Sequence, residues 1–276
     1  MWIKATTPDI LQRRSFDTHL NFLWKADGLP IYIMDNHLAA AWCWMQECHA
    51  EESYQFFHID RHNDLGALAP FTCYQHLKEN PHISIDEYIS IRNTLITQQD
   101  RPAFTWDNYI NQTIQLFPDW FRKCVYATHK RLDDRERRMN LGCNVIEEIF
   151  PCHLMGMLDY ELRISDHDKL MAMARNEALD KWIVNLDLDY FFIEDPSMKF
   201  LTDEYIRNVA GTLKSHIDEI KVLTVALSPE CCGGWRHALD AALAFLRNDH
   251  FLDYCFEFLE DRNLYPNGWH DKEKRV

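Results

Sequence analysis

The stretch FFHIDRHNDLG at residues 56–66 changes from apolar residues to two acids and a histidine that are spaced two positions apart. These residues are Asp60, His62 and Asp64. Side chains alternate between the two faces of an extended strand, so all three are expected on one side. Carboxylate oxygens and imidazole nitrogens that converge are ligands for divalent cations. The stretch predicts a metal site, and a solvated edge strand is the alternative.

A second pair of acids favours the metal site. Asp187 and Asp189 lie within WIVNLDLDYFF at residues 182–192, which is apolar on both sides of the acids. Such a strand is expected to be buried, and a buried carboxylate without a partner is costly. Each acid therefore needs a cation or strong hydrogen-bond donors. His37 directly follows another apolar run and is a further candidate ligand.

The elements that must position these residues alternate between strands and helices. Apolar runs predict four central strands and a weaker fifth, at residues 30–35, 53–60, 181–192, 221–228 and 121–129. Helical patterns lie between them, at residues 38–52, 84–93, 165–181, 202–221 and 233–248. The alternation indicates a three-layer α/β/α fold with a mostly parallel central sheet. Residues 130–165 carry no clear local signal.

The candidate ligands follow the ends of the predicted strands. In open α/β sheets, ligands bind at the carboxyl ends of the strands. Glu230 also lies at such an end, in LSPECCGG after the last predicted strand. Its carboxylate could face a cationic group of a substrate, and an ordinary loop glutamate is the alternative.

Length and composition describe a globular protein. The 276 residues are 47% hydrophobic and contain no linker, repeat or low-complexity tract, so one domain over residues 1–276 is expected. The net charge of −14 argues against a nucleic-acid partner, because such binding needs Lys and Arg to neutralise phosphates. The charge suits a cationic substrate, although solubility alone can account for it.

The expected compartment is the cytoplasm. The N-terminus has no apolar signal segment, and no run of about 18 apolar residues occurs, so no membrane partner is expected. The nine cysteines form no CxxC pair. Free thiols in a reducing compartment therefore fit better than a disulfide framework or a cysteine zinc site.

The candidate ligands suit a pair of hard or borderline divalent ions. Six side chains exceed what one tetrahedral zinc requires and suffice for two ions, with some carboxylates bridging. A water between two such ions could lose a proton near neutral pH and attack an electron-poor trigonal carbon. The ligand types alone do not separate Mn²⁺ from Fe²⁺ or Zn²⁺.

The segments MDNH, HIDRHND and NLDLDYF resemble, in order, the metal-binding segments of the arginase and deacetylase superfamily over residues 30–235. The resemblance implies an arginase-like fold and two Mn²⁺ ions. It assigns one ion to His37, Asp60, Asp64 and Asp187, and the other to Asp60, His62, Asp187 and Asp189. The complete set is similar to that of the ureohydrolases, which hydrolyse guanidinium groups to urea.

The segments DNHLAAAWCW and LSPECCGG are most similar in sequence to the peptide arginases. This resemblance implies hydrolysis of arginine side chains in a ribosomally synthesised precursor peptide, giving ornithine and urea through attack by a metal-bridging hydroxide. Glu230 would hold the guanidinium. The proton-shuttling residue is not assigned, and His76 and His82 are candidates. Two alternatives stay open: a small-molecule ureohydrolase or amidohydrolase acting on agmatine or a guanidino acid, and a non-catalytic, metal-stabilised peptide-binding protein.

Overall fold

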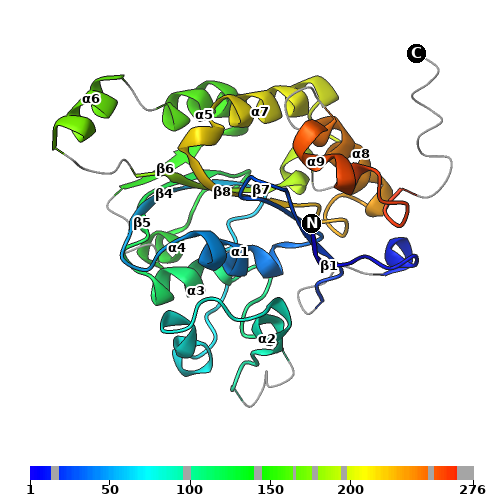
Figure 1. Cartoon of the computed structure of the whole chain (residues 1–276), viewed down its shortest axis with the longest axis horizontal. Helices are drawn as coiled ribbons and strands as arrows, with labels where there is room; N and C mark the ends of the chain where they lie inside the picture. The colour runs from blue at the N-terminus through cyan, green and yellow to red at the C-terminus, as the bar shows by residue number, and fades with distance from the viewer. Residues whose placement is uncertain are drawn as a thin grey trace.

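The structure is a computed structural model and describes residues 1–13, 19–95, 101–139, 145–163, 166–175, 180–193, 198–247 and 252–265. Figure 1 shows a central sheet with helices above and below it. Within the described residues, eight strands form one sheet in the order β1-β2-β3-β8-β7-β4-β5-β6. The mostly parallel α/β fold that the sequence predicts is confirmed.

Six neighbouring strands of this sheet run parallel to one another. They are β3 (Ile31–Met34), β8 (Ile220–Ala226), β7 (Trp182–Asp187), β4 (Tyr54–Ile59), β5 (Phe121–Ala127) and β6 (Val145–Ile149). The edge next to β3 is antiparallel and consists of β2 (Leu23–Lys25) and β1 (Trp2–Lys4). β8 lies between β3 and β7, so the carboxyl ends of strands that are distant in the sequence lie side by side.

Helices cover both faces of the sheet (Figure 1). On one side lie α5 (Leu154–Leu162), α6 (Asp166–Arg175), α7 (Asp203–Ser215), α8 (Trp235–Leu246) and α9 (Leu252–Leu259). On the other side lie α1 (Ala40–Glu47), α2 (Ile85–Ser90), α3 (Tyr109–Leu116) and α4 (Asp134–Met139). Short 3-10 turns join them: η1 (Ile10–Gln12), η2 (His37–Ala39), η3 (Phe71–Cys73), η4 (Gln75–Lys78), η5 (Pro151–His153), η6 (Leu188–Phe191) and η7 (Ile217–Glu219).

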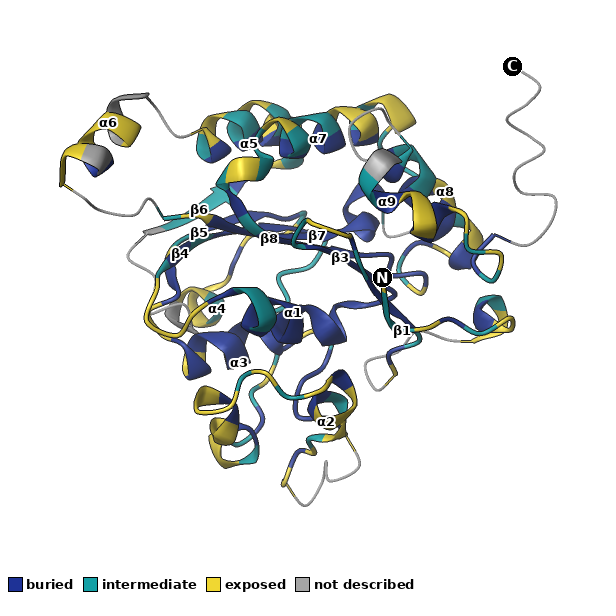
Figure 2. Cartoon of the chain, in the orientation of Figure 1, coloured by how far each residue is buried: buried dark blue, intermediate teal, exposed yellow. Residues whose placement is uncertain are grey.

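Alternate residues of the central strands fill two hydrophobic cores. Phe57 and Val184 belong to the core that contains α5, α7, α8 and α9, whereas Phe56 and Ile183 belong to the core that contains α1, α2 and α3. Figure 2 shows the sheet as buried on both faces. Because both faces are covered, the strands have apolar residues in succession, which is why the sequence reveals them.

Several predicted boundaries differ from the observed ones. The strand predicted over 181–192 ends at Asp187 and continues as the η6 turn, and the strand predicted over 53–60 ends at Ile59. A capping box begins α2, since Ser84 accepts from the amide of Glu87, whose carboxylate accepts from the Ser84 amide. Residues 165 and 176–179 of the helix predicted over 165–181, and residue 248 of the last one, lie outside the described residues. None of the helices in the described ranges has the length and apolarity needed to cross a membrane.

Candidate metal centre

Polar side chains gather where four neighbouring strands, β3, β8, β7 and β4, end. Within the described residues, three groups have ligand atoms within 4.8 Å of one another and could hold a metal ion. They are His37 with Asp60 and Asp187, His58 with Asp60 and Asp64, and His62 with Asp189 and Cys231. All six ligands proposed from the sequence are therefore brought together.

Two histidines lie at the centres of these contacts. Nδ1 of His37 lies 3.2 Å from Asp64, 3.4 Å from Asp60 and 3.5 Å from Asp187, each measured to Oδ2. Nδ1 of His62 lies 3.0 Å from Oδ2 of Asp189 and 3.5 Å from Oδ1 of Asp60. The cluster thus has an inner part around the buried His37 and an outer part around His62, whose side chain is 42% exposed.

The segment after β3 orients His37. The side chain of Asn36 accepts a hydrogen bond from the amide of Leu38 and so caps the η2 turn that carries His37. Asp35 is fully buried and accepts from the amides of Asn21 and Phe22. Asp35 therefore anchors the segment at Asn21 and Phe22, and His37 is the residue after β3 whose side chain reaches the cluster.

Two aspartates each accept from the backbone with one carboxylate oxygen, while the other oxygen faces His37. Oδ1 of Asp60 accepts from the amide of His62 at 2.6 Å, and Oδ1 of Asp187 accepts from the amide of Asp189 at 2.8 Å. An aspartate that bonds an amide two residues on forms a tight turn. The expected strand alternation of Asp60, His62 and Asp64 is therefore wrong, because β4 ends at Ile59 and turns bring these side chains together.

Asp64 has a backbone φ of +51°, in the left-handed region. Asp is among the few residues other than glycine that tolerate this region. The next turn is fixed by Gly66, whose amide donates to the carbonyl of Asp107 at 2.6 Å. A Cβ at Gly66 would lie 2.6 Å from that carbonyl oxygen, so only glycine fits there. This close approach holds Asp64 at the cluster.

A polar layer on β4, β7 and β8 supports the cluster. It consists of His58, Asn185 and Thr224, which are paired across the strands and fully buried. The amide of Asn185 donates to the Tyr109 hydroxyl at 2.9 Å and lies 3.0 Å from Nδ1 of His58. Nε2 of His58 faces the His62 carbonyl at 3.1 Å, so His58 is better placed to hold the loop than to bind an ion.

Arg61 is the cation closest to the outer part. Its backbone amide donates to Oδ1 of Asp189 at 3.2 Å, and its guanidinium lies 3.7 Å from Oδ2. The guanidinium also donates to the carbonyl of Ile193 at 2.7 Å. Arg61 therefore offsets one negative charge from the side, without occupying the space between the aspartates.

The donor set fits bound divalent ions. Oδ2 of Asp60 and Oδ2 of Asp189 are buried and find no hydrogen-bond partner among the described residues. When all four aspartates are ionised and the histidines are neutral, as metal ligation requires, the cluster carries four negative charges, of which Arg61 offsets one. Unpartnered carboxylate oxygens beside two imidazoles are the ligand set of a divalent ion. The residues present fit a binuclear metal group.

The metal-free cluster shifts the pKa values of its members. Burial raises the pKa of Asp187 well above its ordinary value, and the charges of Asp189 and Asp60 raise it further. Burial also raises the pKa of Asp64. For His62, burial favours a lower pKa, but the carboxylates of Asp189 and Asp60, 3.0 and 3.5 Å from its Nδ1, outweigh burial and raise the pKa to about 11. Without metal, protons compensate the negative charge of the cluster.

The turn after β8 closes one side of the cluster. Ser228 has a φ of +42° and donates its hydroxyl to Oδ2 of Asp187. The half-buried Cys231 follows three residues later, and its sulfur joins the group of His62 and Asp189. Glu230 is exposed on this turn. Sequence reasoning missed Ser228 and Cys231 as contributors, although both lie in the LSPECCGG segment.

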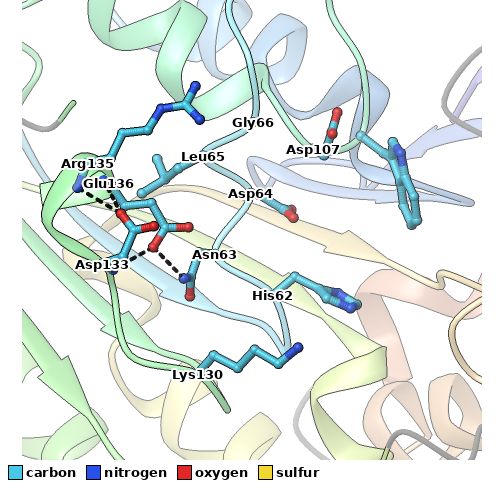
Figure 3. A pocket seen from close by; sticks show the side chains of 11 residues that line it. His62, Asn63, Asp64, Leu65, Gly66, Asp107, Lys130, Asp133, Arg135 and Glu136 are labelled. Carbon is cyan, nitrogen blue, oxygen red and sulfur yellow. Dashed lines mark hydrogen bonds between the residues drawn. The ribbon is translucent and has the colours of Figure 1, made fainter.

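A cavity of about 410 Å³ opens beside the outer part of the cluster (Figure 3). Its walls include His62 and Asp64, together with the exposed residues Asp107, Lys130, Asp133 and Arg135. Glu136 faces it as well and accepts from the side chain of Asn63 at 3.0 Å. Acids outnumber bases in the lining, so a cation is favoured there.

The two histidines considered as proton shuttles, His76 and His82, are both exposed in the segment around η4. Neither belongs to any of the three groups found in the described residues. Their role as shuttles stays a prediction from the sequence.

Comparisons with known proteins find little similarity. No family model matches the sequence, and no curated protein matches it. Among solved structures, the chain is similar to proclavaminate amidino hydrolase from Streptomyces clavuligerus, with a TM-score of 0.39 and 11% sequence identity. The match covers 78% of this chain and 63% of that one. A match this weak does not establish a shared function, so the function rests on the site itself.

Proposed function

We propose that the chain is a binuclear metal hydrolase that hydrolyses the guanidinium of arginine side chains in a ribosomally synthesised precursor peptide, giving ornithine and urea. The observation that carries the proposal is the convergence of six side chains of metal-ligand type from three distant segments, with two buried carboxylate oxygens that find no hydrogen-bond partner among the described residues. The motif resemblance to the ureohydrolases supplies the reaction class and Mn²⁺ as the metal.

The two parts of the cluster correspond to two ion positions. His37, Asp60, Asp64 and Asp187 would hold the inner ion, and Asp60, His62, Asp187 and Asp189 the outer one. The distances of 3.0–3.5 Å between the histidine nitrogens and these carboxylate oxygens support this division. Bound divalent ions would make a potent nucleophile of water at neutral pH.

The acidic cavity supports a cationic substrate. A guanidinium that enters beside His62 and Asp64 meets more negative than positive charge. Glu230, on the turn next to Cys231, would pair with the guanidinium. A carboxylate matches a guanidinium through two parallel hydrogen bonds, which would orient the group for attack.

The proposed hydrolysis needs water as its only co-reactant. Water adds its oxygen to the guanidinium carbon, and the bond from that carbon to the side-chain nitrogen breaks. The nitrogen takes a proton and leaves as the amine of ornithine, while the carbon leaves as urea. The mouth of the cavity includes exposed residues, which suits an arginine held within a longer peptide.

The test is urea release by the manganese-loaded protein from a peptide containing arginine, measured beside free arginine and agmatine. The proposal expects urea and a peptide lighter by the mass of the lost group, with little from free arginine. Turnover of agmatine or a guanidino acid alone would instead favour a small-molecule ureohydrolase. Metal-dependent peptide binding with no mass change would favour a binding protein.

Glu230→Gln examines the substrate role. The variant should keep its metal and raise the KM for the peptide, because the carboxylate that pairs with the guanidinium is lost. Glu204→Gln is the matched control, since Glu204 is an exposed residue in the first turn of α7. Unchanged kinetics in Glu230→Gln would remove Glu230 from the substrate site.

A further inference from the structure

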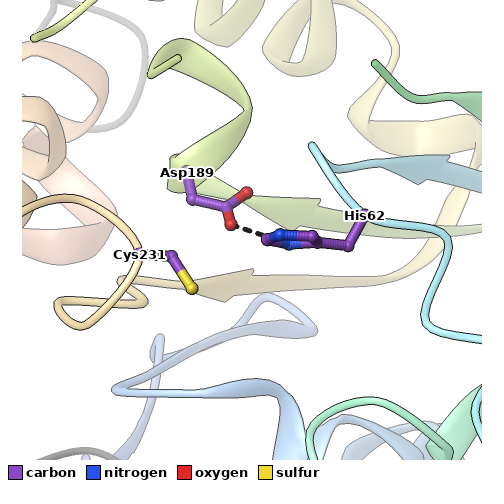
Figure 4. Close-up of side chains that lie close together, drawn as sticks. All are labelled: His62, Asp189 and Cys231. Atoms are coloured by element: carbon purple, nitrogen blue, oxygen red, sulfur yellow. Dashed lines mark ion pairs between the residues drawn. The ribbon is translucent and has the colours of Figure 1, made fainter. Parts of the chain in front are cut away.

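Cys231 contributes a soft ligand atom beside two hard or borderline ones. Its sulfur, a ring nitrogen of His62 and a carboxylate oxygen of Asp189 lie within 4.8 Å of one another. Figure 4 shows these side chains converging from three different segments. Atoms that share one ion at about 2.0–2.3 Å lie roughly 3–4 Å apart, so a small contraction brings these three atoms to the spacing of ligands on one ion.

A second observation points to a cation in this group. Oδ2 of Asp189 is fully buried, and the part of the chain that the structure describes offers it no hydrogen bond; its contact is an ion pair with Nδ1 of His62 at 3.0 Å. Arg61 is farther from this oxygen, at 3.7 Å, and is held by the carbonyl of Ile193. An ion bound between His62, Asp189 and Cys231 would satisfy the oxygen.

The turn that carries Cys231 is well defined. The amides of Cys231 and Cys232 both donate to the carbonyl of Ser228, at 2.9 and 3.0 Å. The thiol of Cys232 donates to the carbonyl of Leu227, and the amide of Gly234 donates to that of Pro229. The sulfur of Cys231 is therefore held beside the cluster by the backbone.

We propose that Cys231 is a thiolate ligand of the outer ion, together with His62 and Asp189. The S–H bond breaks as the sulfur–metal bond forms, and the proton passes to the buffer. A thiolate favours Zn²⁺ or Co²⁺ over Mn²⁺, whereas the inner group of His37, Asp60 and Asp187 offers nitrogen and oxygen alone. The two positions thus differ in metal preference. This inference rests on the metal centre of the proposed function.

The experiment loads the purified protein with Co²⁺ and records its absorption spectrum. The expected result is a sulfur-to-cobalt charge-transfer band in the near ultraviolet, which Cys231→Ser abolishes while the visible bands of cobalt at the inner position remain. Cys152→Ser is the matched control and should retain the charge-transfer band, because Cys152 is an exposed thiol on η5. The same Cys231 variant should bind Zn²⁺ at least about tenfold more weakly.

X-ray absorption of the zinc-loaded wild type needs no variant and should reveal a sulfur neighbour at about 2.3 Å. Absence of sulfur from both spectra, or a charge-transfer band that persists in Cys231→Ser, would overturn the inference. Urea release is measured on the same samples. Sulfur ligation without urea release would reject only the proposed function. Urea release without sulfur ligation would reject only the role of Cys231.

Discussion

The hydroxyl of Tyr109 donates a hydrogen bond to Oδ2 of Asp64 at 3.0 Å, linking α3 to the loop after β4. The same hydroxyl accepts from the amide of Asn185 and lies 3.1 Å from Nδ1 of His37. Tyr109 is fully buried. One phenol therefore connects the inner part of the metal centre to the polar layer beneath it.

Tyr109→Phe should weaken this connection without changing the fold. The buried amide of Asn185 loses an acceptor and Asp64 loses a donor, so the free energy of unfolding should fall by about 1–3 kcal/mol. Urea denaturation of both proteins measures the change. Tyr88→Phe is the control, because the buried Tyr88 hydroxyl makes no hydrogen bond with any described residue and its removal should cost almost nothing. Equal effects in the two variants would contradict the proposed link.

Asp187→Asn should stabilise the metal-free protein at neutral pH. Burial, with the charges of Asp189 and Asp60, raises the pKa of Asp187 in the folded state. The stability that the Asp187 side chain contributes is therefore fully present below pH 3.8, its pKa in the unfolded chain. This stability is lost as the pH rises through the pKa of Asp187 in the folded protein. The variant should be more stable by about 1–3 kcal/mol at pH 8 and show little difference near pH 4.

Denaturation in the presence of a chelator, at both pH values, measures this difference. Adding Mn²⁺ should reverse the order, because the wild type then gains binding energy that the variant lacks. A variant that is destabilised to the same extent with and without metal would show that Asp187 is a structural residue only.

Metal binding should release protons. In the metal-free protein, burial favours a lower pKa for His62, but the nearby carboxylates of Asp189 and Asp60 overcome it and raise the pKa to about 11, so the ring is protonated at pH 7. A histidine must be neutral to bind a metal, and the affinity should rise about tenfold per pH unit for each proton released. Calorimetric titration in two buffers of different ionisation enthalpy measures the number of protons. Identical binding heats in the two buffers would contradict the predicted release of protons.

Ser228→Ala should weaken metal binding while the protein stays folded. Ser228 donates to Oδ2 of Asp187, and groups that orient a metal ligand in this way typically account for a factor of about 10–100 in affinity. Competition with a chelating dye measures the affinity. Ser215→Ala, which removes an exposed hydroxyl on α7, is the control and should leave the affinity unchanged. A similar loss in both variants would show that Ser228 has no particular role.

The central strands were predictable from the sequence, but the edges of the sheet were not. The central strands β3, β4, β7 and β8 are apolar on both faces, whereas β6, at the edge, has the sequence VIEEI, and β1 and β2 have three residues each. In α3, Asn111, Gln112 and Thr113 are buried through hydrogen bonds, so the helix lacks an apolar pattern. Polar burial of this kind depends on long-range contacts that local patterns do not contain.

The sequence predicted which side chains gather at the candidate site but not how they are brought together. Residue types and spacing pointed to Asp60, His62 and Asp64, and these three lie close together through backbone turns and a positive φ at Asp64, rather than through strand alternation. Tyr109 and Asn185 were missed, because they meet the ligands only through packing between distant segments.

The most direct test of the account is the metal content of the protein. The protein is saturated with Mn²⁺, freed of excess metal by gel filtration and measured by elemental analysis. About two ions per chain are expected, falling below one when Asp60 and Asp187 are both replaced by asparagine. A wild-type protein that retains no metal, or a double variant that retains as much as the wild type, would contradict the account.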